Sequence, residues 1–169
     1  MQDFRFQITR ALHDEHAAAT ALLQRLSAWL GQHGADAPPD AADAGAIRLL
    51  GDLAAAVEVE ITVHFAFEEE ALFPFLDDNG ETDLGELYVA EHRVILPLGV
   101  DAAARARAAR LTGFDAAGWA EFRRIAGEFA DYLTRHAEAE EMALIPLLED
   151  LLDEDSDERL AVAYDAMRG

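Results

Sequence analysis

One pattern occurs twice in the chain and constrains the fold more than any other feature of the sequence. It reads HFAFEEEALFP at 64–74 and HAEAEEMALIP at 136–146, so the two copies share the frame HxxxEExxLxP and start 72 residues apart. A shorter pair, EH, occurs at 15–16 and 91–92, with an offset of 76 residues. These two similar offsets predict two related helix pairs with an approximate internal two-fold relation.

Apolar residues recur at three- and four-residue steps, which is the period of an amphipathic helix. Helices are expected at about 3–33, 41–78, 82–111 and 115–153, followed by a short one at 156–168. Thr82, Asp115 and Ser156 are the expected N-caps. Because short, glycine- or proline-containing segments connect these helices, the fold class is predicted to be all-α. The predicted architecture is an antiparallel up-down-up-down four-helix bundle over 1–153, with 154–169 as a short C-terminal helix packed on it or trailing it.

Charge and composition exclude several classes of function. The formal net charge of −21 repels phosphate backbones and anionic headgroups, so neither nucleic acid nor a membrane surface is an expected partner. No cysteine is present, which excludes disulfides and thiolate metal sites and leaves nitrogen and oxygen as metal ligands. No apolar run approaches the ~20 residues that span a bilayer, and the N-terminus lacks a signal-peptide core. A soluble, cytoplasmic protein is therefore expected.

Each copy of the repeat places a histidine four residues before a glutamate. Residues with this spacing share one face of a helix, so an imidazole and a carboxylate point inward together. The pairs are His64 with Glu68 and His136 with Glu140. The next glutamates along the chain, Glu69 and Glu141, lie roughly 140° round the helix from the same histidines and are expected to face solvent.

All four long helices deliver a histidine at nearly one depth. At 1.5 Å per residue, His16, His64, His92 and His136 lie roughly 15 to 25 Å from the end of the bundle that they share. Burial of two carboxylates there would cost several kcal/mol unless cations neutralised them. Such ligands suit iron, manganese or zinc, and two shared carboxylates suit a pair of bridged ions. Without a cation, the facing carboxylates are expected to raise the pKa of at least one of them.

These motifs resemble those of the hemerythrin-like, or HHE cation-binding, domain over about residues 3–153. The resemblance implies two oxo- or hydroxo-bridged iron ions, for which zinc or manganese could substitute. It also implies terminal histidine ligands and two bridging glutamates, at His16, His64, His92, His136, Glu68 and Glu140. Oxygen-carrying hemerythrins have HxxxH on the third helix and HxxxxD on the fourth, and this sequence departs from both. The departures argue against reversible oxygen carriage and leave iron binding intact.

Several further residues are candidates for the surroundings of the metals. His13 lies one turn before His16 and is a candidate fifth nitrogen ligand, with a supporting or an exposed position as the alternatives. Tyr88 and Tyr132 each precede a ligand histidine by four residues, so they either line the pocket or are core aromatics. Glu60 stands in the same relation to His64 and is a candidate hydrogen-bond acceptor.

The resemblance favours a metal- and oxygen-binding protein over an enzyme. Its expected partner is O2 or another small diatomic ligand, in a sensing, storage or stress-response role, and a homodimer is an open alternative to a monomer. A di-iron oxidase, peroxidase or nitric-oxide-handling enzyme is the second hypothesis. An iron-responsive regulatory module is the third.

Overall fold

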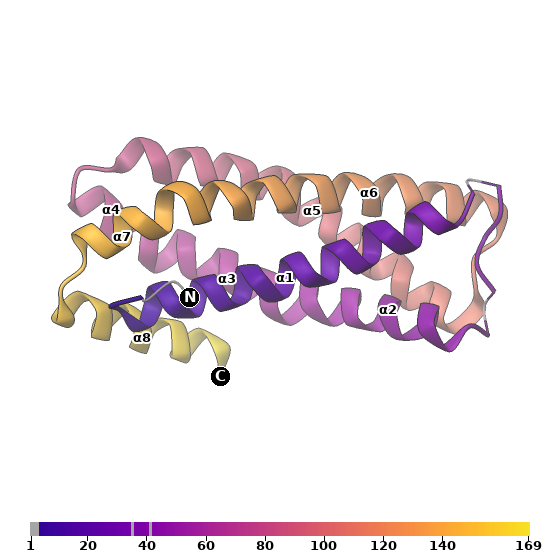
Figure 1. The fold of residues 1–169 in the computed structure, drawn as a ribbon, viewed down its shortest axis with the longest axis horizontal. Coiled ribbons are helices and arrows are strands. Elements are labelled where there is room, and N and C mark those ends of the chain that lie inside the picture. The colour runs from indigo at the N-terminus through magenta and orange to yellow at the C-terminus, as the bar shows by residue number, and fades with distance from the viewer. Residues whose placement is uncertain (1–3, 35, 41) are drawn as a thin grey trace.

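The computed structural model describes residues 4–34, 36–40 and 42–169, and in these ranges it contains helices and no strands (Figure 1). The all-α prediction is therefore confirmed. Helix α1 spans Gln7–Gln32 and α5 spans Thr82–Thr112. Two other long helices are continuous but change pitch along their length. One runs through α2 (Ala44–Ala55), η1 (Ala56–Ile61), α3 (Thr62–Phe67), η2 (Glu68–Leu72) and α4 (Phe73–Asp78), and the other through α6 (Ala116–Ala139), η3 (Glu140–Leu144) and α7 (Ile145–Leu151).

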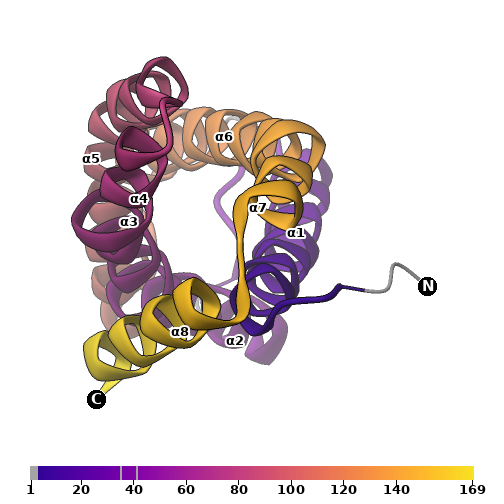
Figure 2. The ribbon, with the colours of Figure 1, turned by 90° about the vertical axis from the view of Figure 1, so that its left-hand side faces the viewer.

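The last helix, α8 (Glu154–Arg168), lies against α1 and α3 on the outside of these long helices, as the end-on view shows (Figure 2). Of the three expected N-caps only Asp115 occupies that position, where its side chain accepts a hydrogen bond from the Gly118 N–H. Thr82 is already the first helical residue of α5. Ser156 is the third residue of α8, where it forms a reciprocal capping box with Asp153.

The segments η1, η2 and η3 are π-helical, with hydrogen bonds that reach back five residues. In η2 the Phe73 N–H donates to the Glu68 carbonyl, and in η3 the Ile145 N–H donates to the Glu140 carbonyl. A proline follows each of these donors. Because proline has no N–H and crowds the carbonyl four residues earlier, a wider turn in front of it relieves the conflict. Neither proline ends its helix, since α4 continues to Asp78 and α7 to Leu151.

Two clusters of buried apolar side chains fill the interior. One lies towards the 33–43 connection and contains Trp29, Trp119 and Phe129, and the other lies towards α8 and contains Leu12, Tyr88 and many others. The buried histidines and glutamates form a polar layer between the two clusters. Within the described ranges, no helix combines the length and the apolar character that crossing a bilayer requires.

Candidate metal centre

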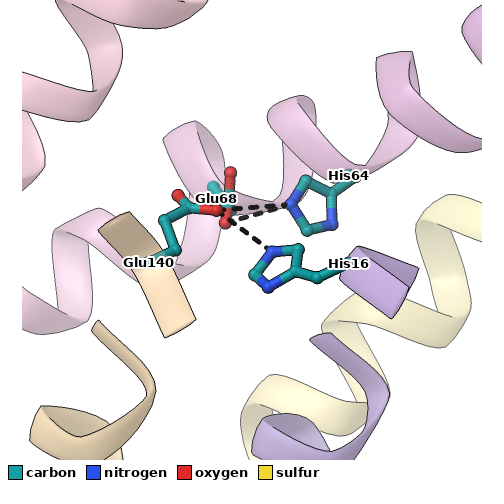
Figure 3. Close-up of side chains that lie close together, drawn as sticks. All are labelled: His16, His64, Glu68 and Glu140. Carbon is teal, nitrogen blue, oxygen red and sulfur yellow. Dashed lines mark ion pairs between the residues drawn. The ribbon is translucent and has the colours of Figure 1, made fainter. Parts of the chain in front are cut away.

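The structure brings the six predicted ligands together as two groups that share both glutamates. One group consists of His16, His64, Glu68 and Glu140, and the other of His92, His136, Glu68 and Glu140. In each group the potential ligand atoms lie within 4.8 Å of one another. Figure 3 shows the first group, in which both imidazoles turn towards the two carboxylates. Because the groups share two carboxylates, the geometry suits two neighbouring cations with both glutamates between them.

Glu68 and Glu140 are completely buried, and their four carboxylate oxygens accept no hydrogen bond from the described residues. Imidazole nitrogens are their nearest polar neighbours. Nε2 of His16 lies 3.0 Å from a Glu140 oxygen, and Nε2 of His64 and His92 each lies 3.3 Å from a Glu68 oxygen. Two buried carboxylates in an apolar bundle are strongly unfavourable without adjacent positive charge, which a bound metal cation would supply and which protonated imidazoles supply in its absence.

Each of the four histidines points Nε2 at the shared glutamates and contacts a further carboxylate through Nδ1. These contacts are His16 with Glu141, His64 with Glu15, His92 with Glu69 and His136 with Glu91, at 2.7 to 2.8 Å. In every case the carboxylate comes from a different long helix than the histidine. An Nδ1–H that donates to a carboxylate leaves the Nε2 lone pair free for a metal ion.

The orientation of His92 and His136 supports the same conclusion. Their Nε2 atoms lie 3.1 Å apart, while both Nδ1 atoms face carboxylates. In the metal-free protein, where the pKa of His92 is raised, an Nε2–H of one ring can donate to the Nε2 of the other. A metal ion would replace that proton and take both nitrogens as ligands.

Glu69 and Glu141 were expected to face solvent, and the Glu69 side chain is exposed, but the carboxylates of both also contact ligand histidines. Both side chains remain partly exposed, at 41% and 25%, yet their oxygens reach the Nδ1 atoms of His92 and His16. A glutamate side chain is long enough to leave its own helix face and contact the neighbouring helix. The sequence carried a signal for this role, because both copies of the repeat retain the second glutamate of EE.

The glutamates of the EH pairs were also missed as functional residues. Glu15 and Glu91 contact His64 and His136, which belong to other helices than their own. Their recurrence beside His16 and His92 was the available signal. Sequence spacing could not identify the partner, since it relates residues within one helix only.

Without a metal, the pKa values of His16, His64 and His92 are raised. Burial lowers the pKa of His16, but the carboxylates of Glu140 and Glu141 face its two nitrogens and raise the pKa to about 9. The pKa of His64 is raised well above its ordinary value, where Glu68, Glu140 and Glu15 outweigh the effect of burial. In this layer the metal-free protein therefore holds positive charge on imidazoles where the metal ions would lie.

The sequence predicted a raised pKa for at least one of the two facing carboxyls, and Glu68 is not that carboxyl. Burial favours its neutral form, but the neighbouring His64 and His92 lower the pKa far below the ordinary value. The histidines are decisive because they lie directly on the carboxylate oxygens, at 3.3 Å.

The remaining predicted residues have different positions. His13 belongs to neither ligand group, and its Nδ1 lies 2.9 Å from Glu141, so the structure places it beside a supporting carboxylate. Tyr88 is buried with its ring edge-on to His136, at a centroid distance of 5.4 Å. Burial is the largest cause of its raised pKa, and the nearby glutamates add to it. The Glu60 side chain lies outside the described residues.

Tyr132 does not line the pocket, because its side chain is 44% exposed and lies beside the Arg135 guanidinium. The buried face of α6 is centred near Leu133, and at about 100° per residue His136 already lies roughly 60° from that centre. Four residues earlier, Tyr132 lies roughly 100° from it, on the solvent side.

Comparison with known protein families also indicates a domain that binds metal cations. The sequence model of the hemerythrin HHE cation-binding domain matches residues 7–148 and, in a second overlapping match, residues 83–168. The second match begins in α5, where the second half of the internal repeat begins. None of the curated proteins matches the chain. The first match covers most of the helical bundle and all six residues of the two ligand groups, so the chain belongs to the hemerythrin HHE cation-binding domain family.

Proposed function

We propose that this protein holds two iron ions, joined by an oxo or hydroxo bridge, in an antiparallel up-down-up-down four-helix bundle. His16 and His64 are the terminal ligands of one ion, His92 and His136 those of the other, and Glu68 and Glu140 bridge the two. The observation that carries the proposal is the pair of fully buried carboxylates whose four oxygens have no hydrogen-bond donor among the described residues. Zinc or manganese could occupy the same ligands, since all are nitrogen or oxygen donors.

The proposed ligand of the centre is O2 or another small diatomic molecule, in a sensing, storage or stress-response role. Bound iron would supply a redox-active ion with a coordination position open to such a ligand. A cavity of about 40 Å³ lies beside His16 and His64, and its other lining side chains are mostly apolar, including Phe65 and Leu133. This exceeds the ~10–15 Å³ that one water molecule requires, so the space suits a small neutral molecule.

The π-helical segment η1 supports ligand binding on the same side. Ala56 and Ile61, at its two ends, line the cavity. The equivalent stretch of the repeat, 72 residues later at 128–133, is α-helical within α6. Insertions of this kind often occur at functional sites, and here one shapes the wall of a cavity that His16, His64 and His136 also line.

Metal analysis of iron-reconstituted protein tests the proposal. Two ions per chain are expected, and one ion per chain would contradict the bridged centre. Glu68→Ala and Glu140→Ala should each abolish the paired site, because each removes a ligand from both groups. Glu70→Ala and Glu138→Ala are the matched controls, since these side chains are exposed. Visible spectra recorded with and without oxygen would then show whether the loaded centre gives a charge-transfer band.

A second candidate is a di-iron oxidase, peroxidase or nitric-oxide-handling enzyme. Tyr88 favours it, because this buried phenol lies against His136 and could donate an electron or a proton. Turnover of peroxide or nitric oxide that falls in Tyr88→Phe would support this candidate, and a stable oxygen adduct without turnover would contradict it. The third hypothesis, an iron-responsive regulatory module, would be supported by a large exposed apolar patch or by helicity that depends on iron. The cytoplasmic location and the homodimer stay predictions.

A further inference from the structure

The two ligand groups contain equivalent residues but have unequal surroundings. Glu15 and Glu91 occupy matching places in the repeat and contact Nδ1 of His64 and His136 respectively. The Glu15 side chain is 19% exposed, whereas the Glu91 side chain is 39% exposed. Among the described residues, Glu91 forms a hydrogen bond with His136 alone. Glu15 forms hydrogen bonds with other residues in addition to its histidine.

Two residues of α8 make this difference. The Tyr164 hydroxyl and the Arg168 guanidinium both donate hydrogen bonds to one oxygen of Glu15, and the other oxygen lies 2.8 Å from Nδ1 of His64. Arg168 also donates to the Tyr164 hydroxyl oxygen over 2.6 Å. Each oxygen of Glu15 therefore has a defined partner, and the carboxylate is fixed between α8 and a metal-ligand candidate.

The position of α8 is itself fixed. Asp157 is buried and accepts hydrogen bonds from the N–H groups of Gln7 and Ile8, which begin α1 and have no cap from Phe6. Asp157 to Tyr164 and Ile8 to Glu15 are both steps of seven residues, or about 10.5 Å along a helix. The two helices therefore keep the same register, and docking at the start of α1 sets the position of Tyr164 over Glu15.

Tyr164 is suited to act as a permanent donor. Its side chain is buried, and its ring packs edge-on against Phe67 of α3 at a centroid distance of 5.0 Å. Burial and the adjacent carboxylate of Glu15 raise its pKa to about 12, so the hydroxyl keeps its proton at physiological pH.

We propose that Tyr164 and Arg168 are positioning residues for the metal position formed by His16 and His64. They orient Glu15, which in turn fixes the tautomer and the ring orientation of His64. The C-terminal helix thereby makes this position bind metal more tightly than the one formed by His92 and His136, whose equivalent carboxylate faces water. The inference rests on the proposed two-ion centre. Loss of such a supporting contact typically lowers metal affinity by about 10–100-fold.

Titration of the metal-free full-length chain with Co²⁺, followed through its visible absorption bands, tests this role. The wild-type chain should take up two ions, and Arg168→Gln and Tyr164→Phe should each weaken one binding step by about 10–100-fold while changing the other less than about three-fold. Arg159→Gln removes the same charge from an exposed position of α8 and should change neither step. Arg168→Lys keeps the charge and should restore part of the affinity.

The Co²⁺ spectrum identifies the affected position. In a His136→Gln background the ion retained at His16 and His64 should show absorption bands that shift when Arg168→Gln is added. Equal weakening of both steps, or no selective change from either α8 variant, would overturn the inference while leaving the two-ion centre intact. If the wild-type chain bound fewer than two ions, the proposed function would fail first.

Discussion

Removal of the metal should make the stability of the protein strongly dependent on pH. In the metal-free protein the pKa of His16 is about 9, against an ordinary value of 6.5. A group whose folded-state pKa is raised stabilises the fold below its unfolded pKa, and this contribution disappears as the pH rises through the folded value. The shift corresponds to about 3 kcal/mol lost between pH 6.5 and about 9. The raised pKa values of His64 and His92 act in the same direction.

Glu68 sets the acidic limit of the same curve. Its pKa is lowered, so its contribution is present above the ordinary value of 4.5 and is lost as the pH falls through the folded-state value. The metal-free protein should therefore be most stable between about pH 4.5 and 6.5. The loss towards alkaline pH follows from deprotonation of the histidines and not from repulsion between carboxylates.

Thermal unfolding of chelator-treated protein, followed by circular dichroism from pH 6 to pH 9.5, measures this effect. For a chain of this size a loss of about 3 kcal/mol corresponds to a fall of roughly 10 °C in Tm. His16→Gln should reduce the slope, whereas His33→Gln should not, since the His33 ring contacts the Trp29 carbonyl and, within the part of the chain that the structure describes, no carboxylate. The iron-loaded protein should show a much flatter curve, because the metal replaces the protons. A metal-free Tm that stays constant or rises over this range would refute the reasoning.

Two further substitutions are each paired with a control substitution for which a different result is expected. Glu69→Ala should lower metal affinity about 10–100-fold because it removes the acceptor of the His92 Nδ1–H, and the adjacent Glu70→Ala should leave a Co²⁺ titration unchanged. Gly99→Ala should lower the free energy of unfolding by about 1–3 kcal/mol, because its Cβ would lie 2.7 Å from a ring atom of a buried phenylalanine. Gly127→Ala, which has open space around the new Cβ, should raise the free energy of unfolding by about 0.5–1 kcal/mol. Urea-induced unfolding of both variants measures these two changes.

The ligand set shows what the spacing of residues along one helix can predict and what it cannot. His64 and Glu68 share a helix face whatever surrounds them, because the four-residue step is a property of the helix itself. The same rule was insufficient for Tyr132, since His136 already lies near the margin of the buried face of α6 and one further turn crosses it. Local spacing predicts which side chains are neighbours on a helix, and the surrounding helices decide where the buried face ends.

The sequence by itself determined the repeated helix pairs. It also determined that four histidines and two glutamates lie at nearly the same depth along the helices, because helical periodicity and helix length are local quantities. Only the tertiary structure decided which carboxylate holds which imidazole. Glu15 meets His64 and Glu91 meets His136 across helix boundaries, and the contact of α8 with Glu15 joins residues almost the whole chain apart. Such pairs depend on the distance and rotation between packed helices. Those quantities are set by the fit of the two apolar clusters above and below the polar layer, which no spacing within one helix encodes.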